Sequence, residues 1–202
     1  KAVMTKKIGI IIMIFGTVLI AAAAVLLLYN HYEDAHAGET AKILVPEIKM
    51  AADKAKAGDE ATPDEAHLAE MTTVEIDGYD YIGYLSIPGL ELELPVMSEW
   101  DYSRLKIAPC RQFGSVWTDD LVIAGHNYSS QFGLLTAIKT GDAVAFTDLN
   151  GSTVDYCVMD IRTIQPAEVD IVEHSGFDLT LYTCTYGGRT RIVIFCNRVE
   201  KK

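Results

Sequence analysis

The chain has 202 residues, half of them hydrophobic, and its 28 acidic and 17 basic side chains give a formal net charge of −11. This length allows one ordinary domain together with an additional segment. The negative charge argues against nucleic acid, and against an anionic lipid surface, as the main partner, and we attribute it to solubility.

The first predicted element is an apolar segment, residues 8–28, which contains no charged residue. Twenty-one residues that rise about 1.5 Å each extend roughly 32 Å, enough to cross a hydrocarbon core of about 30 Å. Lysines precede the segment, whereas Glu33 and Asp34 follow it, so the positive-inside rule predicts that residues 1–7 are cytoplasmic and that everything after Asn30 is outside.

A cleaved signal peptide is the alternative, because residues 35–37 read Ala-His-Ala, the form of a cleavage site. The apolar run is longer than the usual signal core of about 7–15 residues, and charges lie between the run and that site. The sequence therefore favours a retained transmembrane anchor over residues 8–28.

Residues 29–71 are rich in Ala, Glu, Lys and Asp. The stretch 48–57 favours a helix, which Gly58 and Pro63 would interrupt. We expect a solvated, partly helical stalk that holds a domain off the membrane. Three histidines of this region are expected to be solvated: His31, His36 and His67.

From Thr72 onward, short β-like runs alternate with turn residues, and the pair Asn150-Gly151 is typical of a hairpin turn. Residues 132–138 have a short helical pattern. So many short strands predict a closed or nearly closed β-barrel of about 130 residues, a mainly β fold with short helices. The predicted strands are residues 79–87, 90–96, 121–124, 143–147, 153–163, 179–183 and 191–196.

The last two predicted strands carry the candidate chemistry. Cys184 ends one strand, Arg191 opens the next, and His126 follows an earlier apolar strand. A cysteine attacks as a thiolate, an arginine can hold a carbonyl oxygen or an anion, and a histidine can transfer the proton. From residue types alone the signal is modest, because a strand cysteine is more often a small buried hydrophobe.

The run Thr180-Leu181-Tyr182-Thr183-Cys184 resembles the TLxTC signature of sortases, the cysteine transpeptidases of Gram-positive cell surfaces. Further pieces fit this family in order and spacing, and the resemblance covers about residues 79–199. These pieces are Gly83-Tyr84-Leu85-Ser86-Ile87-Pro88, Leu94-Pro95-Val96, Gly125-His126-Asn127 and Arg191-Ile192-Val193-Ile194.

The resemblance implies an eight-stranded sortase β-barrel over residues 72–202, with Cys184 as nucleophile, His126 as general acid/base and Arg191 as the residue that positions the substrate carbonyl or stabilises the oxyanion. It supports a pocket-lining role for Thr183. Asn127 either orients a catalytic partner or caps a turn.

The implied reaction cleaves an LPxTG-like sorting signal through a thioester on the cysteine. An amine, usually on a peptidoglycan precursor, then accepts the acyl group, so that surface proteins become anchored to the cell wall. The implied enzyme is a single-pass membrane protein with an extracellular catalytic domain.

Several residues compete for these roles. Arg189 lies two residues before Arg191, and His174 lies in a predicted surface loop near the cysteine strand.

The other cysteines, Cys110, Cys157 and Cys196, are expected to be buried thiols rather than bridges. Five acidic residues of the domain suggest a calcium site, but their spacing does not match an EF-hand. We therefore expect a solvated loop and no metal cofactor. The acidic residues are Asp119, Asp120, Glu168, Asp170 and Glu173.

Two other functions remain open. One is a non-catalytic, membrane-tethered binding module with a sortase-like barrel, against which the intact trio of His126, Cys184 and Arg191 argues. The other is a hydrolytic cysteine peptidase of another fold, but in papain-like enzymes the cysteine precedes the histidine, whereas here the order is reversed.

Overall fold

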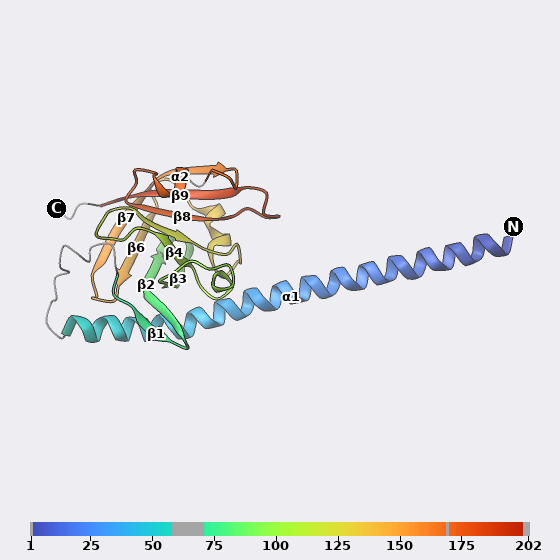
Figure 1. Ribbon diagram of the computed structural model, residues 1–202, viewed down its shortest axis with the longest axis horizontal. Coiled ribbons are helices and arrows are strands. Elements are labelled where there is room, and N and C mark those ends of the chain that lie inside the picture. Colours follow the sequence, from blue (N-terminus) through green and yellow to red (C-terminus); the bar gives the residue numbers. More distant parts are fainter. Residues whose placement is uncertain (1, 58–70, 169, 200–202) are drawn as a thin grey trace.

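The computed structural model describes residues 2–57, 71–168 and 170–199, and within the first range it describes the side chains of residues 7–55. Two parts make up the molecule, a long helix and a β-barrel set against the second half of that helix (Figure 1). His67, Gly58 and Pro63 lie outside the described residues.

Helix α1 spans Ala2–Ala57 without interruption. Its first half is the apolar segment 8–28, whose large side chains are exposed. Among the described residues this is the one helix long and apolar enough to cross a membrane. Pro46 lies inside the helix, where a proline removes one backbone hydrogen bond, yet the helix continues to Ala57.

The second half of α1 is not the solvated stalk that the sequence predicted. Its buried residues recur every three or four positions and so form one face of the helix, which contacts β2 and β3. The prediction failed because half of this stripe is alanine, which also suits an exposed helix. The helical prediction is confirmed, and His31 and His36 are exposed as expected. The buried face consists of Ala37, Ala41, Leu44, Val45, Ile48 and Ala52.

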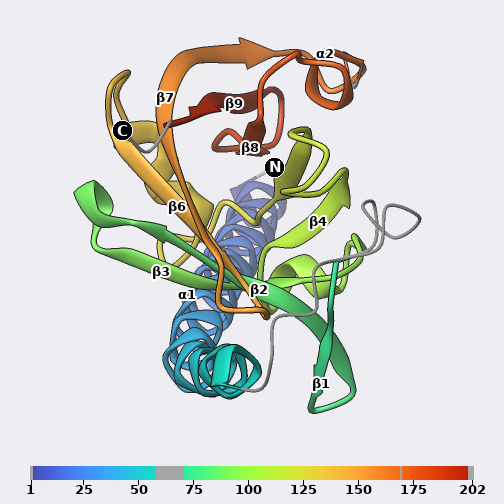
Figure 2. The same cartoon turned by 90° about the vertical axis from the view of Figure 1, so that its left-hand side faces the viewer.

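Within the described ranges, nine strands form one sheet in the order β1-β2-β3-β4-β5-β8-β9-β7-β6, and an additional β2–β6 pairing closes eight of them into a barrel. The predicted eight-stranded barrel is therefore confirmed, and β1 extends β2 as a hairpin outside it. Figure 2 looks along α1 and shows the helix beside the wall that carries β2 and β3. The strands are β1 Val74–Ile76, β2 Tyr79–Ile87, β3 Leu92–Met97, β4 Cys110–Phe113, β5 Leu121–Ala124, β6 Ala143–Asp148, β7 Thr153–Ile164, β8 Leu179–Cys184 and β9 Arg191–Arg198.

Short helices connect the strands, and the predicted helical pattern at 132–138 is a 3-10 helix, η4. The others are η2 Pro88–Leu90, η3 Arg104–Lys106 and α2 Asp170–Glu173, while η4 is Phe132–Ala137. The hairpin predicted at Asn150-Gly151 joins β6 to β7. The main core fills the barrel, and a second core cluster lies between α1 and the barrel, where Leu44 and Ile48 pack with Tyr81 and Met97.

Candidate active site

Cys184 is the last residue of β8, which lies between a parallel and an antiparallel neighbour. On the antiparallel side, Cys184 is paired directly with Arg191, the first residue of β9. Residues paired across antiparallel strands have Cβ atoms only about 4.5–5.5 Å apart. The strand register therefore sets the candidate nucleophile and the candidate cation side by side.

On the parallel side, β5 brings His126 to the same level. Ala124 pairs with Tyr182, and the Gly125 N–H donates to the Tyr182 carbonyl at 3.0 Å. The buried Thr183 hydroxyl donates to the Gly125 carbonyl at 2.9 Å. Continuing the Ala124–Tyr182 register by two residues sets His126 level with Cys184. Thr183 thus fixes the segment that carries the histidine, and its predicted role in binding substrate stays a prediction.

Two residues beside His126 that the sequence did not single out hold its backbone. The His126 N–H donates to the side-chain oxygen of the fully buried Gln131 at 3.3 Å, and the Gln131 amide donates to the Ile107 carbonyl at 3.2 Å. The Phe132 N–H donates to the His126 carbonyl at 3.2 Å. A Cβ on Gly125 would lie 2.4 Å from the Phe132 ring, so this position requires glycine.

The imidazole of His126 is half-buried. Burial lowers its pKa below the ordinary value, and the nearby cation of Lys106 lowers it further. Its ring centroid lies 3.8 Å from that of Tyr128, and within the described part of the chain its buried Nδ1 has no hydrogen-bond partner. Burial therefore favours a neutral imidazole whose ring can take up a proton.

The loop after His126 is held by α1. The Tyr128 hydroxyl donates to Glu33 at 2.8 Å, and Lys106 forms an ion pair with the same carboxylate at 3.0 Å. Hydrogen bonds from Tyr29, Lys106 and Tyr128 lower the Glu33 pKa to about 2. These contacts tie the histidine loop to the helix one and a half turns beyond the apolar segment.

Asp34 makes a second set of contacts with the same loop. Its carboxylate accepts the Ser129 N–H at 3.1 Å and the Ser130 N–H at 2.9 Å, and the Ser130 hydroxyl donates to the Asp34 carbonyl at 2.8 Å. These hydrogen bonds lower the pKa of the Asp34 carboxyl, although burial opposes them. The sequence did not predict this contact between segments 95 residues apart.

A groove of about 890 Å³ runs along the barrel surface to Arg191. Tyr182 and Gln112 line it, and the Tyr182 hydroxyl donates to Gln112. The Gln112 amide donates in turn to Glu173 at 2.9 Å. Burial raises the pKa of Tyr182 to about 12, so its hydroxyl stays a donor. The groove also has apolar walls, which Trp100, Phe113, Ile164 and Val172 supply.

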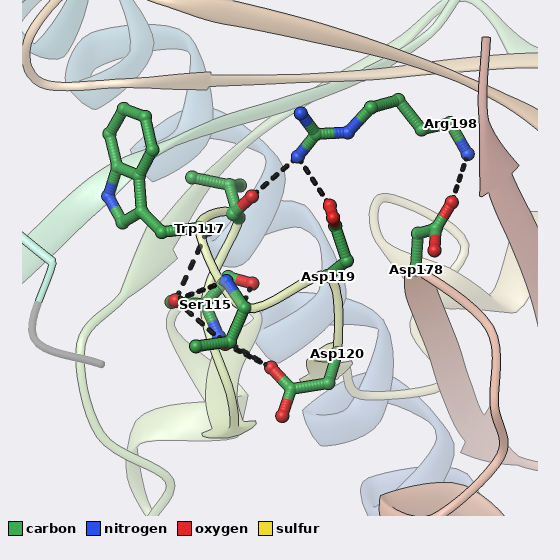
Figure 3. Close-up of polar contacts among 8 residues, drawn as sticks. Ser115, Trp117, Asp119, Asp120, Asp178 and Arg198 are labelled. Atoms are coloured by element: carbon green, nitrogen blue, oxygen red, sulfur yellow. Dashed lines mark hydrogen bonds and ion pairs between the residues drawn. The ribbon is translucent and has the colours of Figure 1, made fainter. Parts of the chain in front are cut away.

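One wall of this groove, the loop between β4 and β5, is fastened to the C-terminal strand (Figure 3). Arg198 donates to the Val116 carbonyl at 2.5 Å and forms an ion pair with Asp119 at 2.6 Å, while its backbone N–H donates to Asp178 at 2.7 Å. Within the loop, Asp120 accepts the backbone N–H of Ser115 at 3.2 Å. Two of the five acidic residues of the suggested calcium site, Asp119 and Asp120, are thus engaged in holding the loop.

Two of the three other acidic candidates accept hydrogen bonds as well. Glu168 accepts the Gln165 N–H at 2.6 Å, and Glu173 bonds Gln112. Within the described ranges, no group of three or more histidine, cysteine or acidic side chains is arranged to hold a metal ion.

The strand register pairs Cys184 with Arg191 and not with the competing Arg189. Arg189 is exposed in the turn before β9, whereas the Arg191 guanidinium donates to the Gly188 and Thr190 carbonyls, each at 3.2 Å. His174 is exposed, and its ring centroid lies 6.1 Å from that of Phe113. Asn127 is half-buried in the loop after β5.

Each of the four cysteines, all within the described residues, is a free thiol, as predicted. Cys110 and Cys196 are fully buried, and burial raises the pKa of each thiol to about 12. Cys157 is half-buried. Burial thus makes Cys110 and Cys196 inert, in contrast to Cys184 at the partly exposed end of its strand.

Known proteins match both the sequence and the fold. The family model for the sortase domain matches residues 85–199. Sortase A of Bacillus anthracis is 31% identical over 127 residues, which is 60% of this chain and 60% of that protein. The chain thus spans about 60% of the length of that curated relative.

Solved structures agree with this match. Sortase C1 of Streptococcus agalactiae has a TM-score of 0.55 and 26% identity, with 80% of this chain and 90% of that chain covered. The sortase C1 structure from Streptococcus suis has the same TM-score at 21% identity, with 77% and 96% covered. Because the family model covers more than half of the residues, the chain belongs to the sortase family.

Proposed function

We propose that this chain is a membrane-anchored cysteine transpeptidase that cleaves an LPxTG-like sorting signal and transfers the acyl group to an amine. One observation carries the proposal. The register of β5, β8 and β9 brings Cys184 at the end of β8, Arg191 at the start of β9 and His126, two residues after β5, to one end of the barrel. A half-buried imidazole that favours the neutral form, a partly exposed thiol and a fixed cation are the three groups that acyl transfer through a thioester needs.

In the proposed first half-reaction, the Cys184 sulfur attacks the carbonyl carbon of the scissile peptide bond while its proton passes to His126. Arg191 faces the carbonyl oxygen as it becomes negatively charged. The C–N bond then breaks, His126 gives the proton to the departing amine, and a thioester remains on Cys184.

In the second half-reaction, an incoming amine attacks the thioester carbonyl and gives its proton to His126. The C–S bond breaks, the proton returns to the sulfur, and a new amide is released. If water takes the place of the amine, the same steps yield an acid, so transfer and hydrolysis differ only in the acceptor.

The groove that ends at Arg191 would hold the peptide. Its polar lining residues Tyr182 and Gln112 can hydrogen-bond an extended backbone, and its apolar walls suit the aliphatic side chains of a sorting signal. The proposed partners are sorting-signal-bearing surface proteins and a peptidoglycan precursor or another amine. The proposed topology has the N-terminus in the cytoplasm and the barrel outside, in line with the charges that flank the apolar helix.

The test measures transfer from a fluorescent LPxTG peptide to a primary amine, with products separated by mass. Cys184→Ala is expected to abolish both transfer and hydrolysis, and normal turnover in this variant would refute the proposal. Arg191→Ala is expected to lose far more activity than the matched control Arg189→Ala, because only Arg191 is paired with the cysteine. An acid product even at saturating amine would instead indicate a hydrolytic peptidase.

A further inference from the structure

We propose that the catalytic end of the barrel rests on the lipid headgroups of the bilayer that α1 crosses, so that the site opens at the membrane surface. This inference rests on the proposed function, since it concerns where the anchored enzyme meets its amine acceptor. It is opposite to the expectation of a stalk that holds the domain off the membrane.

The height of the site above the bilayer follows from the helix. The apolar segment ends at Leu28, and Glu33 is five residues further along the same uninterrupted helix. Five residues rise about 7.5 Å, and the headgroup region adds roughly 5–7 Å to each side of the hydrocarbon core. Glu33 therefore lies at the outer edge of the headgroup layer.

The catalytic end of the barrel is held at this height. Glu33 bonds Tyr128 and Lys106, and Asp34 bonds Ser129 and Ser130, all of which lie in or beside the loop that follows His126. The histidine is thus two residues away from a side chain that contacts the helix at the edge of the membrane.

The helix packs too closely to swing away. Gly38 lies one turn beyond Asp34, and a Cβ at this position would come within 3.0 Å of the Ser130 side chain. The buried face of α1 continues from Ala37 to Ala52 along the barrel. A continuous helix with several turns buried against the barrel has no joint at which the barrel could tilt.

The surface that this geometry presents to the lipid carries tyrosines. The turn between β8 and β9 projects from the barrel toward the N-terminal end of α1 (Figure 1), and its Tyr186 is fully exposed. Tyr102, which lies near Lys106, is 69% exposed, and Tyr32 of the helix is 67% exposed. Tyrosine is enriched where membrane and water meet, because its ring is apolar and its hydroxyl is polar.

Net charge does not set this orientation, since the chain carries −11 and an anionic surface would repel it. The covalent continuity of the anchor with the docked helix sets it instead. The partner surface is therefore the headgroup layer itself, and an amine carried on a lipid headgroup would reach Cys184 without leaving the membrane plane.

The first experiment measures depth directly on the full chain in phospholipid nanodiscs. Tyr186→Trp is compared with Ser152→Trp, which places the same probe at an exposed site in the β6–β7 hairpin, at the opposite end of the barrel. Lipids with a spin label on the headgroup quench the added tryptophan, after subtraction of the parent emission from Trp100 and Trp117. We expect severalfold stronger quenching at position 186 than at 152, and equal quenching would overturn the proposal.

The second experiment raises the barrel. A seven-residue helical insert composed of Ala, Glu and Lys after Asn30 lengthens α1 by about 10.5 Å. Seven residues make close to two helical turns, so the face of α1 that packs on the barrel keeps nearly the same direction relative to the anchor. We expect weaker quenching at position 186 and severalfold slower transfer to a glycine amine attached to a phospholipid headgroup, while transfer to soluble glycine amide is unchanged. An unchanged rate with the lipid-borne amine would contradict the proposal.

The two proposals fail in different ways. If the parent chain transfers to neither amine, the proposed function is wrong, while the quenching comparison still decides the orientation. If it transfers equally well to both amines before and after the insertion, the transpeptidase stands and the membrane-surface site is wrong.

Discussion

Gly125→Ala is the most direct test of how the barrel positions His126. The new methyl would lie 2.4 Å from two atoms of the Phe132 ring, whereas carbon atoms prefer a separation of about 3.5–4.0 Å. The ring must therefore move by more than 1 Å. Phe132 is fully buried and its N–H bonds the His126 carbonyl, so the displacement passes to the histidine.

The expected cost has two parts. Overpacking a core typically costs about 1–3 kcal/mol of unfolding free energy. Misplacing a catalytic group by about 1 Å can lower turnover by roughly 100-fold. We expect Gly125→Ala to show both effects, measured by chemical denaturation in mild detergent and by peptide-to-amine transfer. Gly89→Ala is the matched control, because its Cβ would meet nothing closer than 4.0 Å.

A double-mutant cycle separates this clash from other effects. Phe132→Ala by itself is expected to cost about 3–5 kcal/mol. Adding Gly125→Ala should then cost about 1–3 kcal/mol less than it does in the parent chain, because the ring that it clashes with is absent. Additive costs, or parental stability and turnover in Gly125→Ala, would refute the reasoning.

Further predictions concern the groove wall, the histidine and metals. Arg198→Gln is expected to raise KM for the peptide and to cost about 1–2 kcal/mol of stability, since it removes a hydrogen bond and a partly exposed ion pair. The control is Arg162→Gln, which removes an exposed ion pair on the same sheet. If the two substitutions raise KM equally, Arg198 does not have this role in the groove wall. NMR titration should show that Lys106→Gln raises the His126 pKa and that Glu33→Gln lowers it, because the two charges act on that pKa in opposite directions. Shifts of the same sign in the two variants would be inconsistent with these contacts. Because the folded His126 pKa lies below the ordinary value of 6.5, the folded state should lose stability as pH falls below about 6.5 in the parent chain. A chelator should leave the rate of peptide-to-amine transfer unchanged. A loss of transfer that added calcium restores would instead indicate that the acidic residues bind calcium.

The sequence predicted the barrel because most of its strands alternate or form apolar runs between turn residues. Tyr79–Ile87 and Leu121–Ala124 were predicted to the residue. Two strands were missed. Cys110–Phe113 carries Arg111 and Gln112, whose side chains face the groove rather than a core, so the run lacks an apolar pattern. Val74–Ile76 is only three residues long and pairs with β2 at the edge of the sheet.

The motif also singled out Cys184, His126 and Arg191. Local sequence sufficed for this because Cys184 ends a strand, Arg191 opens the next, and His126 follows the end of another by two residues. The supporting contacts were not predictable in the same way. Gln131 reads as an ordinary polar residue, and only the folded chain shows it fully buried between His126 and Ile107. The contact of Glu33 with Tyr128 joins segments 95 residues apart, and no periodicity in either segment points to the other.

The docking of α1 changes what can be exchanged between related proteins. The first half of α1 serves as the anchor, and its second half contributes side chains to a hydrophobic core, where Ile48 packs with Tyr81 and Met97. A chimera that takes a foreign anchor must therefore be joined before Tyr29, at the end of the apolar segment. A fragment that starts at residue 72 would instead leave a hydrophobic strip of barrel wall facing water, and we expect it to aggregate or to associate through that strip.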